Sequence, residues 1–128
     1  MQPGKVHTGE EILSMDSQAV WLKECPAAVT VCDRQGKILE MNDAACKAFA
    51  KYGGRELVGK NLLDCHPEPA REKIRKMLAE PTTDCYTVEM QGKKKLVYQM
   101  PWFSQGRFSG IMEIMLEIPA DIPHFIRG

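Results

Sequence analysis

Apolar residues change their spacing three times along this chain, and each spacing predicts a different kind of element. From residue 8 to residue 25 they recur at helical intervals, which predicts an N-terminal helix. Thr8 and Glu11 have the spacing of a capping box, and Pro26 pushes the residue before it out of the helical conformation. Ile12, Met15, Ala19 and Leu22 share one face of this helix, and Leu13, Val20 and Trp21 broaden the apolar surface.

Two short apolar and β-branched runs follow, at 27–32 and 37–41. Between them Asp33 and Gly36 occupy the first and fourth positions of a four-residue turn, where a type I turn prefers these residue types. The sequence therefore predicts two strands joined as a hairpin.

The middle of the chain returns to helical spacing. Asn42 is a good N-cap residue, and Gly53 with Gly54 favours the end of the helix that it begins. A broken apolar segment, 55–66, leads to a further helix that starts near Pro67 and ends before Pro81.

The last third alternates with a period of two and predicts three strands, at 85–90, 95–103 and 108–118. In the last strand Met112, Ile114 and Leu116 share one face, and Glu113 lies on the other. Short links make the five strands antiparallel, because parallel pairs need long crossovers. The helical stretch 42–81 is the one long connection, and we expect it to cross one face of the sheet in an α+β fold.

Five segments stand out by their order and spacing: 26–31 (PAAVTV), 33–38 (DRQGKI), 41–45 (MNDAA), 56–64 (ELVGKNLLD) and 110–113 (GIME). Together they resemble the PAS (Per-Arnt-Sim) family, and 64–67 (DCHP) is similar to bacterial members with a Cys-His-Pro turn. The resemblance implies an N-terminal flanking helix over 1–23, a PAS domain over 24–118 and a C-terminal tail over 119–128. It also implies a five-stranded antiparallel sheet with short helices on one face. The sheet's concave face holds haem, a flavin, an organic acid or nothing in different members.

Length and charge limit the function classes. The chain has 128 residues, which suits one domain, with 17 basic and 17 acidic side chains. This balance gives no reason to expect nucleic acid or a membrane surface as a partner, and no apolar stretch approaches the ~20 residues of a membrane helix. We expect a cytoplasmic protein. Five cysteines without a C-x-x-C pair predict free thiols.

The adjacent pair Cys65 and His66 is the most suggestive chemistry, because both residue types bind metals or haem. Adjacent positions are poor spacing for zinc, so no metal site is expected. Haem is not favoured either, since the helix after the turn, from 74 to 80, has no histidine. The cysteine motif of flavin photosensors is absent as well. The alternative is that His66 closes the turn through a backbone bond while Cys65 packs as a small hydrophobe.

Gln99 is a candidate polar contact for a ligand. It shares one strand face with Val97, while Tyr98 and Trp102 share the other face. If the Gln99 face is the concave one, its amide is a polar group in an apolar pocket; in the alternative, Gln99 points to solvent and the aromatic face is core. The candidate pocket residues are Val31, Met41, Phe49, Leu62, Cys65, His66, Ile74, Met77, Val97 and Gln99.

These observations leave three functions open. The first is a sensory or regulatory domain that binds a small organic molecule and signals through a homodimer or a partner protein. The second is a ligand-free interaction module, and the third is a haem or thiol redox sensor. No nucleophile and base stand together in the sequence, so we do not expect an enzyme. The candidate dimer interface is the apolar surface of the first helix, formed by Ile12, Met15, Ala19, Trp21 and Leu22; the alternative is a helix folded onto its own domain.

Overall fold

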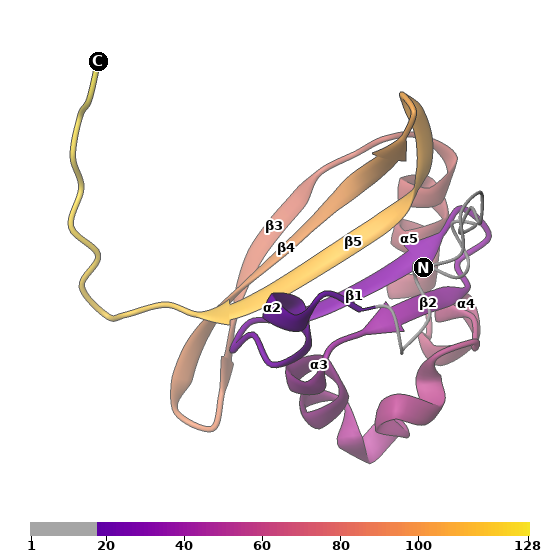
Figure 1. Cartoon of the computed structure of the whole chain (residues 1–128), viewed down its shortest axis with the longest axis horizontal. Helices are drawn as coiled ribbons and strands as arrows, with labels where there is room; N and C mark the ends of the chain where they lie inside the picture. The colour runs from indigo at the N-terminus through magenta and orange to yellow at the C-terminus, as the bar shows by residue number, and fades with distance from the viewer. Residues whose placement is uncertain (1–17) are drawn as a thin grey trace, which may run out of the picture.

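Five strands form one antiparallel sheet in the order β2-β1-β5-β4-β3 in this computed structural model, which describes residues 18–128 (Figure 1). The predicted α+β fold with a five-stranded sheet is confirmed. The two strands farthest apart in sequence, β1 and β5, are neighbours at the centre of the sheet. The strands are β1 (Ala28–Asp33), β2 (Ile38–Met41), β3 (Asp84–Met90), β4 (Lys93–Ser104) and β5 (Arg107–Glu117).

Short helices connect β2 to β3 and lie on one side of the sheet (Figure 1). We call the side of the sheet that they cover the covered face and the opposite side the outer face. These helices are α3 (Asp43–Ala48), α4 (Leu62–Cys65) and α5 (Ala70–Ala79), with 3-10 turns at Ala50–Tyr52 and Gly54–Leu57. A further short helix, α2 (Val20–Lys23), precedes β1.

Two-residue turns join the last three strands. Gln91 and Gly92 both have positive φ angles, 55° and 76°, and Gln105 and Gly106 have 52° and 77°. A pair of positive φ angles matches the right-handed twist of a hairpin, and glycine adopts this conformation without strain. These turns stand where the sequence predicts them, and they set the register of β3, β4 and β5.

The Asn42 side chain joins three segments of the chain. Its oxygen accepts hydrogen bonds from the amides of Val29 (2.9 Å) and Ala45 (3.0 Å), and the second bond caps α3. Its amide group donates to the carbonyls of Leu22 (3.0 Å) and Ala27 (2.8 Å). Because Asn42 is fully buried, these four bonds satisfy its polar atoms and fasten the N-terminal segment to the sheet.

The N-terminal helix differs from the sequence prediction. A helix continuous through Ala19 is wrong, because Ala19 has an extended backbone (φ −57°, ψ 137°) and α2 begins after it. The physical reason lies at Gln18, whose amide donates to the buried carboxylate of Glu40 (2.5 Å) and to the carbonyl of Met41 (3.4 Å). These tertiary bonds outweigh helical propensity. Two predicted interface residues, Ile12 and Met15, lie outside the described residues.

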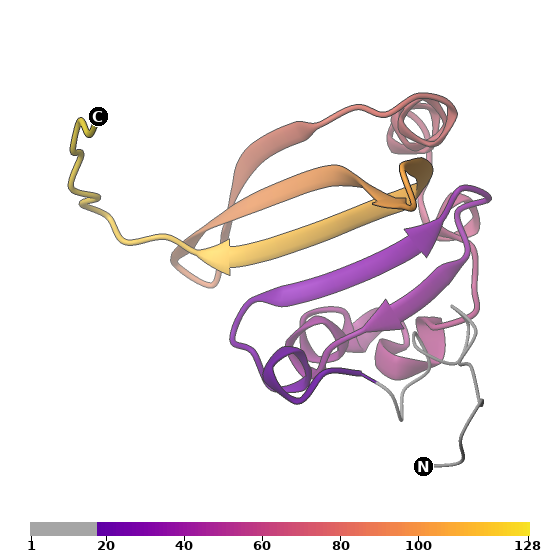
Figure 2. The same cartoon turned by 45° about the horizontal axis from the view of Figure 1, so that its top comes forward.

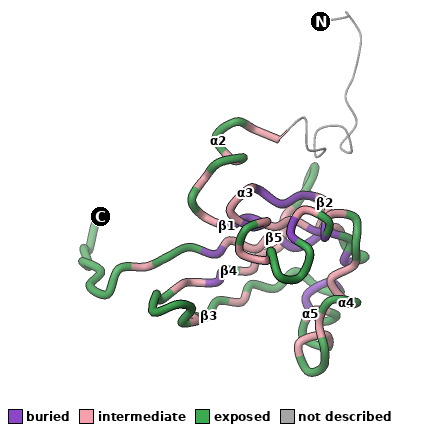
Figure 3. The backbone as a smooth tube through the Cα atoms, turned by 90° about the horizontal axis from the view of Figure 1, so that it is seen from below, coloured by how far each residue is buried: buried purple, intermediate pink, exposed green. Residues whose placement is uncertain are grey.

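Two apolar clusters form the core on the covered face. The larger, under α3, contains Ala28, Ile38, Met41, Ala45, Leu57, Val97 and Met115. The smaller, under α5, contains Cys32, Met77, Leu78 and Ile111. Figure 3 shows the buried positions gathered on β1, β2 and α3, while β3 and the tail after β5 are exposed.

On the outer face, Gly110 allows the Trp102 side chain and the β1 backbone to come unusually close to β5. The Trp102 indole of β4 donates a hydrogen bond to the Cys32 carbonyl of β1 (2.8 Å), although β5 lies between these strands. A Cβ atom at Gly110 would stand 1.9 Å from that carbonyl oxygen and 2.7 Å from the indole nitrogen. Glycine is therefore the residue that this crossing requires.

Candidate functional site

Four polar residues cross the covered face in a single row, one from each of β1, β5, β4 and β3. Thr30 is paired with Glu113, Glu113 with Gln99, and Gln99 with Asp84. The Gln99 amide donates to the Glu113 carboxylate (2.8 Å). We call Thr30, Glu113, Gln99 and Asp84 the polar row.

The polar row separates the two apolar clusters. On one side, Ala28, Met115 and Val97 occupy the neighbouring positions two residues along their strands; on the other side, Cys32 and Ile111 do so. The four side chains are partly buried, and the Gln99–Glu113 and Lys73–Asp84 pairs offset the cost of removing their polar groups from water. A few polar groups between apolar walls are also the usual composition of a ligand site.

The charges at the β3 end of the row largely cancel. Lys73 of α5 forms an ion pair with Asp84 and lowers the pKa of that carboxyl group. The Lys73 ammonium also lies 4.8 Å from the centre of the Tyr86 ring. Burial, together with the negative charge of Glu113, raises the pKa of Tyr86. Of the two carboxylates in the polar row, Asp84 pairs with a lysine, whereas Glu113 accepts its hydrogen bond from the neutral amide of Gln99.

The structure decides which face of β4 is covered. Val97 is buried in the larger cluster, so Gln99, two residues further on, also lies on the covered face. The alternative interpretation, with Gln99 in solvent and the aromatic face as core, is wrong. Tyr98 lies on the outer face with 38% of its surface exposed.

Most other predicted pocket residues belong to the covered side, where they are part of the core. Met41 and Met77 are buried, and Phe49, Leu62 and Ile74 are partly buried against the clusters. Val31 is a correction to the prediction. It pairs with Met112, one position from Cys32, so alternation along β1 points its side chain to the outer face.

The Cys-His pair is divided between two environments. His66 Nδ1 lies 2.8 Å from the Leu62 carbonyl and donates to it, which closes the turn after α4. Cys65, at the end of α4, is exposed, so the expectation that it packs as a small hydrophobe is wrong. Among residues 18–128, no three potential ligand side chains gather as a metal site.

Cys32 is the most deeply buried thiol, and its chemistry follows from that burial. Removal from water raises its pKa to about 11, with smaller contributions from the charges of Asp33 and Glu113. The reactive thiolate form is therefore scarce at neutral pH. Burial raises the pKa of Cys46 as well.

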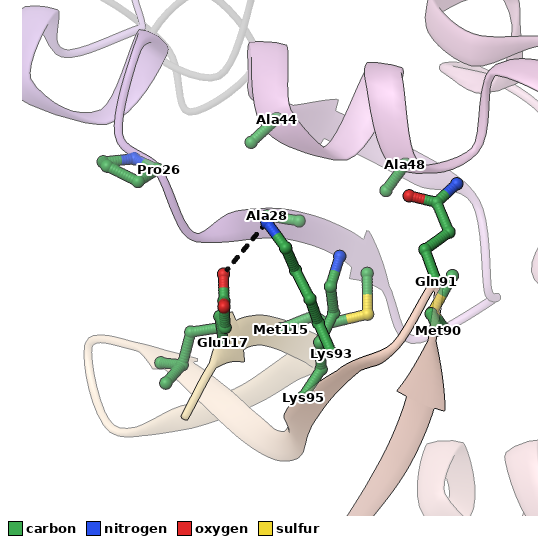
Figure 4. Close-up of a pocket in the computed structure, with 11 residues that line it drawn as sticks. Pro26, Ala28, Ala44, Ala48, Met90, Gln91, Lys93, Lys95, Met115 and Glu117 are labelled. Atoms are coloured by element: carbon green, nitrogen blue, oxygen red, sulfur yellow. Dashed lines mark ion pairs between the residues drawn. The ribbon is translucent and has the colours of Figure 1, made fainter. Parts of the chain in front are cut away.

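A separate pocket of about 180 Å³ opens at the end of the sheet, between α3 and the β3–β4 hairpin (Figure 4). We call it the end pocket. None of the ten predicted pocket residues lines it. The feature of the sequence that marks it is the lysine run 93–95, in which Lys95 is half-buried. Its lining residues are Pro26, Ala28, Ala44, Ala48, Met90, Gln91, Lys93, Lys95, Met115, Leu116 and Glu117.

The outer face is apolar, and most of its side chains are partly buried. None of the helices between β2 and β3 lies across it (Figures 1 and 2), and Phe103 at its edge is exposed. Next to the sheet, Trp21 of α2 has 78% of its surface exposed, whereas Ala19 and Leu22 are half-buried. The apolar residues of the outer face are Val29, Val31, Leu96, Tyr98, Met100, Trp102, Met112, Ile114 and Leu116.

Comparison with known proteins supports the fold. The model of a family described as the PAS fold matches residues 22–120. A C-terminal domain from Streptococcus mutans is 22% identical, with a TM-score of 0.62 over 81% of this chain and 84% of that one. The PAS domain of Bordetella pertussis BvgS is 19% identical, with a TM-score of 0.58 over 78% and 82%.

A third similar structure is the Aer2 receptor of Vibrio cholerae, described as a dual PAS-heme oxygen sensor. It is 21% identical, with a TM-score of 0.51 over 73% of this chain and 95% of that one. A search of curated proteins finds no match. No helix within residues 18–128 is long and apolar enough to cross a membrane.

Proposed function

Because the chain belongs to the PAS family, whose members are sensory and signalling modules, we propose that it is a ligand-binding regulatory domain. In this proposal a small molecule binds between the sheet and the helices and contacts the polar row. The domain acts in the cytoplasm by binding rather than by catalysis. Its response passes to a second copy of the chain or to a partner protein.

The polar row is the observation that carries this proposal. A folded domain gains no stability from a carboxylate, an amide and a hydroxyl in the middle of its covered face. Ligand sites, by contrast, combine apolar walls with a few polar groups that fix the orientation of the bound molecule. Glu113, paired with the neutral Gln99, favours a ligand group that donates hydrogen bonds or carries positive charge.

A response follows if ligand binding changes the position of α5 relative to the sheet. Lys73 joins α5 to the β3 end of the polar row through Asp84, so a ligand at the row competes for or strengthens this contact. A ligand shifts a conformational equilibrium only by its difference in affinity for the two states. The exposed Trp21 and the apolar outer face support a second copy as the recipient of the signal.

The ligand-free interaction module remains the second candidate, and one observation favours it. Met41, Met77 and Val97 are buried at 1%, 4% and 4% exposure, so the two clusters beside the polar row are well filled. A haem sensor, which is how the Vibrio cholerae Aer2 receptor is described, requires a ligand other than His66 Nδ1, which already donates to the Leu62 carbonyl.

Native mass spectrometry of protein purified without added ligand tests the proposal. We expect dimer mass plus a discrete excess that disappears on denaturation and identifies the bound molecule. The Gln99→Ala variant should lose most of that excess, whereas Gln35→Ala, in an exposed turn, should keep it. A bare chain mass in the parent protein would favour the interaction module, and a visible absorption band would favour the haem sensor.

A further inference from the structure

We propose that the end pocket is a second binding site and that it takes a small apolar molecule bearing one carboxylate, with Lys95 as its charged anchor. The site differs from the polar row. Val97 and Met115, both buried, lie between them on β4 and β5. The inference therefore goes beyond the proposed function and does not depend on a ligand at the polar row.

Small side chains leave the space that an apolar ligand would fill. Ala44 and Ala48 of α3 face the pocket from one side, and Ala28 of β1 lies at its base beside Met115 (Figure 4). Methyl groups and a thioether give a surface that attracts apolar atoms and adapts to their shape. The volume of about 180 Å³ lies below the range of drug-sized ligands, so the ligand is small.

The charges at the rim favour an anion. Lys93 and Glu117 are paired at 3.7 Å and cancel each other. Lys95 forms no ion pair with any residue from 18 to 128, so the pocket carries one net positive charge. Figure 4 shows the Lys93 and Lys95 side chains extending from β4 toward the α3 side of the pocket.

The position of Lys95 on the strand explains its orientation. It lies two residues before Val97, so its side chain belongs to the covered face and its stem is half-buried. Lys94, one position earlier, belongs to the outer face and is exposed. A single ammonium group beside alanine and methionine side chains fits a monovalent carboxylate better than a phosphate, which usually draws several donors or an arginine fork.

Titration of the full chain with octanoate tests the inference, with methionine methyl groups observed by NMR. Met90 and Met115 line the pocket, whereas Met100 and Met112 lie on the outer face. We expect saturable shifts of the Met90 and Met115 signals and none for the other two. The same titration with octylammonium and 1-octanol should give at least tenfold weaker binding, because neither pairs with Lys95.

Matched lysine variants identify the anchor. Lys95→Gln should weaken octanoate binding by about tenfold or more, the size expected for one charge-assisted hydrogen bond. Lys94→Gln, on the same strand but the other face, should change nothing. Equal binding of 1-octanol, unchanged affinity in Lys95→Gln, or shifts confined to other methionines would overturn the inference. Each of these results leaves the native mass measurement of the polar row unaffected.

Discussion

The two faces of the sheet differ in a way that runs against their composition. On β5, the face with Met112, Ile114 and Leu116 is the more apolar one, yet it is the outer face. The face with Glu113 is covered by helices and contains the core. Burial in this domain therefore follows from which side the 42–81 connection crosses, and apolar content does not decide it.

Adjacent residues on one strand make this difference measurable. Met115 has 7% of its surface exposed and Leu116 has 38%, although both are large and apolar. The covered face contains the core and also the polar row and the end pocket. The outer face has partly exposed apolar area, which in the proposed function contacts a second copy or a partner protein. On β4 and β5 the covered face therefore combines stability with both proposed ligand sites, whereas the outer face is the proposed protein contact.

Truncating one apolar side chain on each face should give the largest difference in stability. Met115→Ala should lower the free energy of unfolding by about 2–4 kcal/mol, because it removes buried atoms and leaves a cavity. Leu116→Ala should lower it by about 1 kcal/mol or less, since a partly exposed side chain loses little. Urea unfolding followed by circular dichroism gives both values. Equal losses would show that the outer face is as well covered as the inner one.

Alkaline pH should lower the free energy of unfolding, because the buried Cys32 thiol resists ionisation. Its pKa rises from 9.0 to about 11 on folding, so the folded state holds the thiol proton more tightly than the unfolded state does. The stability that this tighter proton binding gives is fully present below pH 9 and is lost as pH rises from 9 to 11. At 1.36 kcal/mol per pKa unit, the free energy of unfolding should fall by about 2–3 kcal/mol over this range. Denaturant unfolding across this pH range measures it.

The control for this prediction is a second thiol on the other face. Cys85 lies on the outer side of β3 and is exposed. Cys32→Ala should flatten the stability curve between pH 9 and 11, whereas Cys85→Ala should follow the parent protein. An unchanged slope in Cys32→Ala would assign the alkaline loss to other groups.

The smallest effect concerns the polar row. Glu113→Leu alone should cost about 1–2 kcal/mol of stability, because it leaves the Gln99 amide without its partner. The double change Gln99→Leu with Glu113→Leu should return stability to within about 1 kcal/mol of the parent protein or above it. Thermal and urea unfolding of these two variants and of Gln99→Leu alone complete the cycle. A large loss in the double variant would make the row a structural element.

The sequence was sufficient for the strands, the turns and the family. Asp33, which accepts hydrogen bonds from the amides of Gln35 (3.0 Å) and Lys37 (2.9 Å), makes its turn through local contacts. The glycine turns of the later hairpins are local in the same sense. Short-range chemistry of this kind is visible in a linear sequence.

Features that depend on distant contacts were missed. Ala19 is not helical, because the Gln18 side chain bonds to Glu40, more than twenty positions away. Val31 faces outward because of the pairing with β5, and its strand alone shows no preference. The residues that line the end pocket come from four separate segments, so no local sequence pattern predicts it. The polar row became visible once the register aligned its residues.

The crossing of Trp102 over Gly110 has a consequence for sequence variation among relatives. No side chain fits at position 110, because a Cβ atom there would stand 1.9 Å from the Cys32 carbonyl oxygen and 2.9 Å from the Asp33 Cα, as well as 2.7 Å from the indole nitrogen. The backbone of β1 therefore requires the glycine even in a lineage that has lost the tryptophan, whereas a lineage that changes the glycine also loses the room for the indole. We expect the dependence to run in one direction: sequences with Gly110 and no Trp102 should occur, and sequences with Trp102 and no Gly110 should be rare.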